Sequence, residues 1–389
     1  MTSAAKRTKT ASPPRILVLS ASVGAGHLRA AEAVVAAAKE LRPDAVVESR
    51  DVLDFTSKMF RQLYSKAYLD LVAKAPHLLG YVYDHLDRDT QHGHKLGDKL
   101  RIAVDKLNLR DFQKWLLATP WDLVINTHFL PAERIARLKR KDKFTAPQVT
   151  VCTDFDTHRL WVNEPCEHYF VATEEGKLHL EHWEIPASKI DVTGIPVMPA
   201  FATPADRAAC CRRMNIAGDR PVVLQMCGGF GVGPVEGVFG SLLEVATPID
   251  LVVICGRNEK LKAALEKLPT PPRHRAHIVG LTHEMDAWMG CADLVVSKPG
   301  GLTTSEILAR GVAMVVVNPI PGQESRNSDY LLENGAAVKA NHPSALRHKV
   351  EQILATPARL RAMQSAARTL GHPRAAYDVV EKSLRVAFG

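Results

Sequence analysis

Three features of other protein classes are missing from this chain of 389 residues. No apolar run approaches the ~18–20 residues of a membrane helix, which excludes a polytopic membrane protein. No apolar leader segment follows the basic N-terminus, so we expect no secretory signal. No C-x-x-C motif joins the seven scattered cysteines, and several of them lie in strand-like runs. This pattern predicts free thiols in a reducing compartment, the cytoplasm.

What is present fits a folded protein that meets anionic partners. With 46% hydrophobic and 24% charged residues, the chain can bury a large core, and its length favours two domains. The formal net charge is +8, and the first 15 residues contribute Lys6, Arg7, Lys9 and Arg15 without any acid. Such an excess favours a phospholipid surface or nucleotide phosphates. No nucleic-acid motif accompanies it, so we expect no nucleic-acid partner.

The order of strand-like and helical segments predicts an α/β protein. A buried strand at 15–20, a glycine turn at 22–27, an Ala-rich helix at 28–41 and a strand at 45–48 open a doubly wound domain. Residues 52–115 look mostly helical. Further strands are expected at 123–126, 148–152 and 168–171, and, after a Pro-containing linker at 194–200, at 221–227, 251–255, 277–279, 294–297 and 313–318. We therefore predict two Rossmann-like lobes facing a central cleft, with a helical C-terminal tail.

The segment from Ser297 to Glu306 has the strongest ligand-binding pattern. Gly300 and Gly301 follow an apolar strand and open a helix, where the backbone can approach a ligand and free N–H groups can bind phosphate. Thr303 adds a hydroxyl, and Glu306 could accept the two hydroxyls of a ribose. Two glycines alone more often form a plain strand-to-helix turn.

A second polar segment follows the next strand. It carries Gln323, Glu324 and Asn327, short polar groups of the kind that bind sugar hydroxyls, and an ordinary surface loop is the alternative. The carboxyl ends of parallel strands meet at one edge of a sheet, so the two segments are expected together there.

Six motifs in order resemble one family. They are G-A-G-H at 24–27, T-D-F-D-T-H-R-L-W at 153–161, G-I-P-V at 194–197, C-G-R-N-E-K-L at 255–261, S-K-P-G-G-L-T-T-S-E at 297–306 and P-I-P-G-Q-E-S-R-N at 319–327. Together they look like the monogalactosyldiacylglycerol synthases and the processive diacylglycerol glycosyltransferases, within the family 28 glycosyltransferases. A more distant likeness is to the N-acetylglucosaminyl transferase that makes lipid II. The resemblance covers roughly residues 15–340.

The resemblance implies the GT-B fold, no metal and no cofactor, and inverting transfer of galactose or glucose from a UDP-sugar to diacylglycerol. It leaves the choice of sugar and processive addition of a second sugar open. Composition predicts a disordered basic arm at 1–14, and the Pro-containing linker divides the rest into lobes at 15–197 and 198–370. The resemblance implies that the first lobe binds the acceptor and the membrane, that the second binds the UDP-sugar, and that a helix at 371–389 packs back on the first lobe.

The donor residues carried over from the resemblance lie in the second half. The diphosphate would be held by Gly228, Gly229, Gly300, Gly301 and Thr303, with Lys298 or Arg257 adding charge, and Glu306 would bind the ribose. Uracil would lie against Gly280, Leu281 and Met285, and the hexose would face Gln323, Glu324 and Asn327.

The first half would supply the acceptor and the base. His27, beside Gly26, is the candidate base because an imidazole takes up a proton near pH 7. Asp154 is either a rival base or the group that orients His27. His158 and Trp161 complete the acceptor motif. Phe60, Tyr64 and Tyr68 form a helical aromatic stripe with basic neighbours, which is either an interfacial helix or an ordinary core face.

Several alternatives remain open at this point. Asp154-Phe155-Asp156 matches the D-x-D metal signature of the other glycosyltransferase fold, although the phosphate-binding loops lie elsewhere. A polyprenyl or other lipid acceptor, or a nucleotide-sugar sensor without turnover, would keep the fold. An NAD(P) oxidoreductase is disfavoured because the first loop lacks a full G-x-G-x-x-G. The favoured reading places the protein peripherally at the cytoplasmic side of the cell membrane, on anionic lipids.

Overall fold

Two parallel six-stranded sheets form the centre of the molecule. The computed structural model describes residues 13–22, 24–57, 109–227 and 234–389. The first sheet has the order β2-β1-β3-β4-β5-β6. Its strands are β1 (Arg15–Ser20), β2 (Val46–Asp51), β3 (Leu123–Asn126), β4 (Gln148–Val151), β5 (His168–Val171) and β6 (Ile190–Val192). Every strand pairing in this sheet is parallel, as expected when helical segments connect the strands.

The second sheet repeats this arrangement with the order β12-β11-β10-β7-β8-β9. Its strands are β7 (Val222–Met226), β8 (Asp250–Ile254), β9 (Arg275–Val279), β10 (Leu294–Ser297), β11 (Ala313–Val317) and β12 (Ala337–Ala340). In both sheets the strand order reverses beside the first strand, at β1/β3 and at β7/β10. Ligands of open α/β sheets bind at such reversals, outside the carboxyl ends of the strands.

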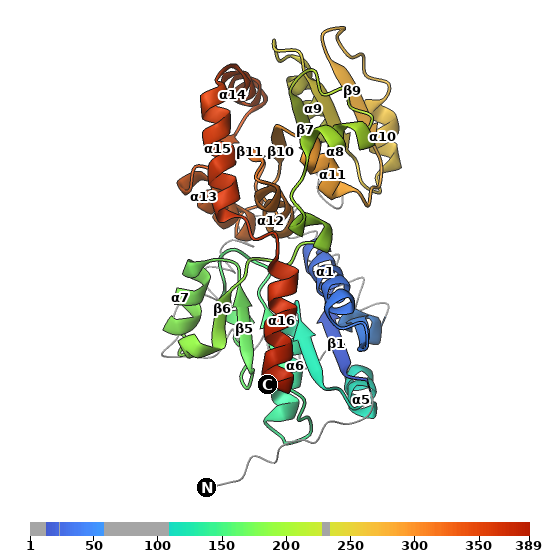
Figure 1. The fold of residues 1–389 in the computed structure, drawn as a ribbon, viewed down its shortest axis with the longest axis vertical. Helices are drawn as coiled ribbons and strands as arrows, with labels where there is room; N and C mark the ends of the chain where they lie inside the picture. Colours follow the sequence, from blue (N-terminus) through green and yellow to red (C-terminus); the bar gives the residue numbers. More distant parts are fainter. Residues whose placement is uncertain (1–12, 23, 58–108, 228–233) are drawn as a thin grey trace.

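Helices cover both faces of each sheet (Figure 1). The α-helices of the described residues are α1 (Ala25–Leu41), α5 (Arg110–Ala118), α6 (Phe129–Lys139), α7 (Glu174–His182), α8 (Arg207–Arg213), α9 (Val235–Leu243), α10 (Glu259–Leu265), α11 (Met285–Cys291), α12 (Gly301–Arg310), α13 (Gln323–Glu333), α14 (Pro343–Ala355), α15 (Pro357–Leu370) and α16 (Ala375–Phe388). Short 3-10 turns are η1 (Val52–Phe55), η2 (Arg159–Trp161), η3 (Ala187–Lys189) and η4 (Pro199–Ala202). Local signals set several ends: Thr173 caps α7, and Gly311 ends α12 in the left-handed conformation.

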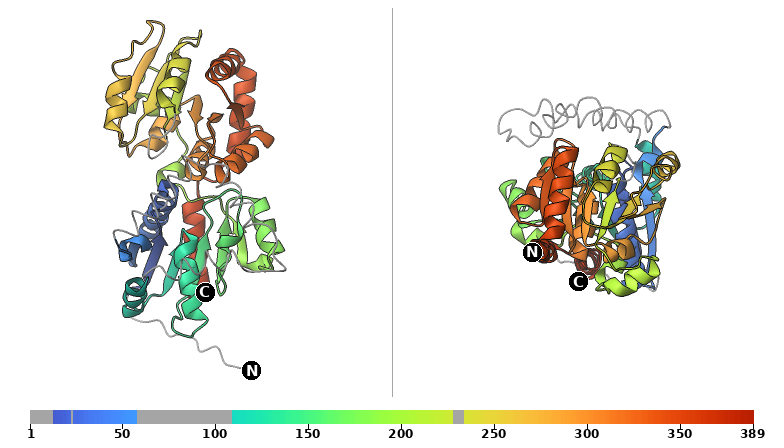
Figure 2. Two further views of the ribbon diagram at one scale, coloured as in Figure 1. Left: turned by 180° about the vertical axis from the view of Figure 1, so that it is seen from behind. Right: turned by 90° about the horizontal axis from the view of Figure 1, so that it is seen from above.

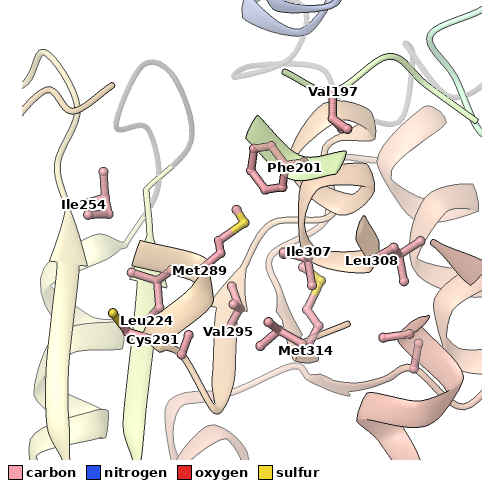
Figure 3. Close-up of a cluster of buried hydrophobic side chains, with 14 of the residues drawn as sticks. Val197, Phe201, Leu224, Ile254, Met289, Cys291, Val295, Ile307, Leu308 and Met314 are labelled. Carbon is pink, nitrogen blue, oxygen red and sulfur yellow. The ribbon is translucent and has the colours of Figure 1, made fainter. Parts of the chain in front are cut away.

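The central strands are buried on both faces, which explains their unbroken apolar sequences. Every residue of β10 and β11 is buried. One cluster in the second lobe joins Leu224 of β7 and Val295 of β10 to Ile307 of α12, and it continues through Phe201 toward the linker (Figure 3). The apolar cores thus fix α12, and with it the glycine turn that precedes this helix.

The two lobes are stacked along the long axis of the molecule, and the chain crosses between them twice (Figures 1 and 2). It passes from β6 to the second lobe through Gly194 and returns after α15 through His372. Gly194 has a φ of +78°, and a Cβ there would lie 2.5 Å from the Cβ of His372, so the two crossings touch at a position that requires glycine. The returning helix α16 packs on the first lobe against α1.

Candidate functional site

In the first lobe, the carboxyl ends of neighbouring strands bring three motifs together. His27 lies in the first turn of α1, which follows β1. His128 follows β3, and Thr153 and Asp154 follow β4. Because β1, β3 and β4 are adjacent, these residues share one edge of the sheet, at its strand-order reversal.

His27 is held from two sides by threonines. Its Nδ1 lies 2.6 Å from Oγ1 of Thr153, and its main-chain carbonyl accepts a hydrogen bond of 3.0 Å from the Thr127 hydroxyl. Burial lowers the pKa of His27 below its ordinary value of 6.5, an effect that the charge of Asp154 opposes and that of His158 reinforces. His27 is therefore a neutral imidazole at pH 7, the form that can accept a proton.

The carboxylate of Asp154 contacts Trp161 and His158. Its Oδ2 accepts a hydrogen bond of 2.9 Å from Nε1 of Trp161 and lies 3.4 Å from Nε2 of His158. Trp161 is fully buried and His158 is 2% exposed, so neither offers a surface to a membrane or a lipid acceptor in this arrangement. The structure differs here from the expectation for an acceptor motif: these two residues hold Asp154, and Thr153 is the residue that contacts His27.

His128 is a site residue that the sequence analysis missed. Its ring lies edge-on to that of His27, with centroids 4.7 Å apart, and its Nδ1 accepts a hydrogen bond of 3.0 Å from the amide of Leu130. This bond caps α6 and requires an unprotonated Nδ1. Burial, together with the nearby His27 and His158, holds the pKa of His128 well below its usual range. The sequence feature that could have predicted this residue is its position, two residues after the buried strand β3, which pairs with β1.

The start of α12 in the second lobe lies directly against this edge. A Cβ added to Gly301 would be 2.7 Å from the main-chain oxygen of Thr153, and one added to Gly26 would be 3.9 Å from Cβ of Leu302. Only a residue without a side chain allows this approach at position 301. Thr303 is half-buried in the first turn of α12, and Lys298 is half-buried just after β10.

Glu306, predicted to bind a ribose, is 5% exposed on the second turn of α12. Burial raises the pKa of this carboxyl to about 7, although Arg29, which belongs to α1 of the other lobe, opposes the shift. Asp286, beside the predicted uracil residue Met285, adds to it. A buried carboxyl with a shifted pKa, influenced by charges from both lobes, is typical of a functional site.

The loop after β11 packs on the glycine turn. Gly322, with a φ of +98°, directly precedes α13, and Glu324 in the first turn of this helix accepts a hydrogen bond of 2.8 Å from the amide of Ile320. A Cβ on Gly300 would lie 3.9 Å from Oε1 of Glu324, and Asn327 Nδ2 donates a bond of 2.9 Å to the carbonyl of Pro299. Among the described residues, Oδ1 of Asn327 is buried without a hydrogen-bond partner.

The remaining predicted residues are less closely gathered. Gln323 is half-buried at the first position of α13. Met285 begins α11, next to α12, whereas Arg257 is exposed after β8, and Leu281 is 56% exposed after β9, beside Gly280. Five predicted residues lie outside the described part of the chain: Phe60, Tyr64, Tyr68, Gly228 and Gly229.

Both carboxylates of the Asp-Phe-Asp motif are engaged with nitrogen donors. Asp154 binds Trp161, as above, and Asp156 lies 2.6 Å from Nη1 of Arg326 and 2.9 Å from Nδ1 of His179. A divalent cation would have to displace these partners. In the described residues, no helix has the length and apolar character needed to cross a membrane.

Comparison with known proteins gives matches over both lobes. A family model described as Monogalactosyldiacylglycerol (MGDG) synthase matches residues 27–197, and a model described as Glycosyl transferases group 1 matches residues 239–370. A curated processive diacylglycerol beta-glucosyltransferase of Bacillus mycoides is 30% identical over 381 residues, 95% of this chain and 93% of that protein. One of Staphylococcus saprophyticus is 28% identical over 96% of this chain and 93% of its own length.

Solved structures agree on the architecture. MurG of Acinetobacter baumannii superposes with a TM-score of 0.59 at 18% identity, covering 96% of this chain and 100% of its own. MnaA of S. aureus in its UDP co-structure gives a TM-score of 0.60 at 12% identity, covering 97% and 98%. These likenesses concern the fold, and they confirm the predicted GT-B arrangement of two Rossmann-like lobes with a helical tail.

Proposed function

Because the chain belongs to the family of the processive diacylglycerol beta-glucosyltransferases, we propose that it transfers a hexose from a UDP-sugar to diacylglycerol, forming a β-glycosyldiacylglycerol. The observation that carries the proposal is the junction of the lobes, where the imidazole of His27 and the start of α12 are joined through one residue, Thr153. Displacement of a diphosphate requires a base on one side of the reacting carbon and an anion-binding group on the other. The junction supplies both, with the imidazole from one lobe and the helix N-terminus from the other.

The reaction proceeds in one displacement. His27 takes the proton of the diacylglycerol hydroxyl as the oxygen attacks the anomeric carbon, and the bond to the UDP oxygen breaks on the opposite face. Inversion converts an α-linked donor into a β-glycoside. Free N–H groups at the start of α12, with Thr303 and Lys298, stabilise the charge that develops on the leaving diphosphate. These fixed N–H dipoles stabilise the negative charge that a metal cation would otherwise stabilise, so the reaction needs no metal.

Contacts to the donor divide between two loops. Glu306 accepts hydrogen bonds from the ribose, while Glu324 and Asn327, which already contact the glycine turn, face the hexose. The unpartnered Oδ1 of Asn327 is available to accept from a sugar hydroxyl. Glucose is favoured over galactose as the transferred sugar, because the relatives over the full chain are named glucosyltransferases. Their names also favour processive addition of a second sugar.

Attachment to the membrane is peripheral and on the cytoplasmic side. The acceptor is a lipid, and the net charge of +8, half of it in the first 15 residues, supports contact with anionic headgroups. Vesicles with and without anionic lipid, sedimented with the protein at low and high salt, test this part. Equal retention on neutral vesicles would contradict it.

A turnover assay tests the whole proposal. The purified protein is incubated with UDP-glucose or UDP-galactose and diacylglycerol vesicles, and the lipid product is identified by mass, sugar analysis and the anomeric coupling constant. We expect a β-glucosyl product, formed at the same rate in EDTA. An α-linked product, or complete loss of activity in EDTA that added Mg²⁺ or Mn²⁺ restores, would contradict the mechanism.

A further inference from the structure

We infer that Thr153 is a positioning residue that holds His27 in the tautomer with Nδ1 protonated and Nε2 free for the acceptor hydroxyl, and that it links this tautomer to the contact between the lobes. The inference rests on the proposed function, because it gives the proposed base a partner. It also removes Asp154 from that role.

The side-chain partner of the base is a hydroxyl, and a hydrogen bond to the main chain of Thr127 also raises the pKa of the ring. Thr153 Oγ1 lies 2.6 Å from Nδ1 of His27, whereas the nearest carboxylate, that of Asp154, receives the indole N–H of Trp161 at 2.9 Å and lies 3.4 Å from Nε2 of His158. Thr153 itself is 6% exposed, so its hydroxyl is shielded from competing water. A short bond in a shielded position constrains both the ring plane and the site of the proton.

The chemistry of the imidazole sets the direction of this bond. A neutral imidazole carries one N–H, and only the other nitrogen can take a proton. If Thr153 accepts from Nδ1–H, Nε2 has the free lone pair that a base needs. Nδ1–H is retained when Nε2 becomes protonated, so the same hydroxyl also accepts from the imidazolium. If Thr153 donated instead, Nε2 would carry the hydrogen and the imidazole could not take the acceptor's proton.

The backbone of the same residue contacts the donor lobe. The main-chain oxygen of Thr153 lies 2.7 Å from the position of a Cβ on Gly301, the first residue of α12. If α12 moves away from the first lobe, the contact between the main chain of Thr153 and Gly301 is lost. The residue that aligns His27 therefore contacts the donor helix only when the two lobes are together.

Paired substitutions separate the hydroxyl from the shape of the side chain. Thr153→Val keeps the branched shape and removes the hydroxyl, and Thr153→Ser keeps the hydroxyl. We expect T153V to lower kcat by roughly 10- to 100-fold, part of the contribution of a general base, with the KM for UDP-glucose nearly unchanged. T153S should keep kcat within about threefold of the wild type. Thr369→Val, on the exposed face of α15, is the matched control.

Nitrogen-15 NMR of histidine-labelled protein reads the tautomer without any turnover, with the His27 signals assigned by their loss in His27→Gln. The expected wild-type pattern is Nδ1–H, kept in T153S and lost in T153V. An Nε2–H pattern in the wild type, or an unchanged pattern and kcat in T153V, would overturn the inference. If the wild type formed no glycolipid while the NMR pattern was as expected, the proposed function would fail and the Thr153–His27 pairing would stand.

Discussion

Arg326 of α13 and Asp156 of the first lobe form an ion pair across the junction, with 2.6 Å between Nη1 and Oδ2. Asp156 also lies 2.9 Å from Nδ1 of His179 on α7. Burial alone would raise the pKa of Asp156, but the hydrogen bond from His179 and the charge of Arg326 lower it, so the pair persists at mildly acidic pH. The ring of Phe155 lies tilted against that of Tyr330, with centroids 5.2 Å apart, so the two lobes meet here through a charged and an aromatic contact.

A double-mutant cycle should detect this pair in catalysis. Asp156→Asn and Arg326→Gln are each expected to lower kcat/KM for the donor several-fold, and their coupling should be about 1 kcal/mol, the usual size for a half-exposed ion pair. Added salt should weaken the coupling. Asp44→Asn, which breaks the exposed pair with Arg42 inside the first lobe, serves as the control. Strictly additive effects of the two substitutions would exclude a direct role of the pair.

Gly301→Ala should separate the lobes without unfolding them. The new methyl group would lie 2.7 Å from a main-chain oxygen that cannot rotate away, so the junction must open. We expect a larger radius of gyration in solution scattering and a loss of kcat of at least 10-fold, because alignment across the junction is lost. Gly240→Ala on α9, where nothing lies within 4 Å of the new methyl group, should stabilise the protein slightly and keep full activity. Normal activity of G301A would refute the close approach.

Glu306→Gln should raise the stability of the folded protein above pH 7 and lower its affinity for the donor. The folded-state pKa of this carboxyl is raised from 4.5 to about 7, so the folded protein binds the proton more tightly between these values and stability falls as pH rises through them. The full cost, on the order of 3 kcal/mol, is present above pH 7. Glutamine removes it, so E306Q should melt higher at pH 8 but not at pH 4.5.

The same variant should raise the KM for UDP-glucose about 10-fold, because an amide replaces a charged acceptor of the ribose hydroxyls. Glu333→Gln, at the exposed end of α13, is the matched control for both measurements. A lower melting temperature at pH 8 would show that Glu306 is stabilised by partners, and an unchanged KM would remove it from the donor site.

The activity should depend on His27 and on its neutral form. His27→Ala is expected to lower kcat by about 10²–10⁴-fold, the usual contribution of a general base. His348→Ala, on an exposed face of α14, should have no effect. Steady-state turnover with UDP-glucose and diacylglycerol is the measurement, and a near wild-type rate for H27A would remove this residue from the mechanism.

The acid limb of the pH profile should report on the charges around His27. Since its pKa lies below 6.5, activity should be lost as pH falls through a value below 6.5. Asp154 raises that pKa, while His158 lowers it and the third facing ring, His128, is held neutral by burial. Asp154→Asn should therefore shift the acid limb of kcat/KM to lower pH. Asp111→Asn, at an exposed position of α5, should leave the acid limb in place, and a shift of D154N to higher pH would contradict the electrostatic argument.

Much of the fold follows from local sequence. Ten of the strands lie where apolar runs predicted them, because parallel strands buried on both faces need such runs. Two strands were missed, β6 (Ile190–Val192) and β12 (Ala337–Ala340). Both are short strands at the edge of a sheet, where a strand pairs with a neighbour on one side only. Such strands are less buried and need no unbroken apolar run, so their sequences resemble loops.

The arrangement inside the site was less predictable. The motifs placed His27, Asp154 and Gly301 at strand ends correctly, because chain order and parallel pairing decide which loops share an edge. The contact of His27 with Thr153 joins residues 126 positions apart, and neighbouring Asp154 could have served equally well on spacing alone. Which of two adjacent side chains faces the base depends on the backbone turn after β4 and on Trp161, which draws Asp154 away.

The crossing of α16 has a consequence for how the protein is made. Ala376, Val379 and Val380 of α16 belong to the same apolar cluster as β1 and α1, which the ribosome makes long before this helix. Since chains emerge at roughly 5–20 residues per second, one face of the N-terminal lobe stays open to water until α16 has emerged. A premature stop before Ala375 would therefore lower the solubility of a lobe that is encoded far upstream.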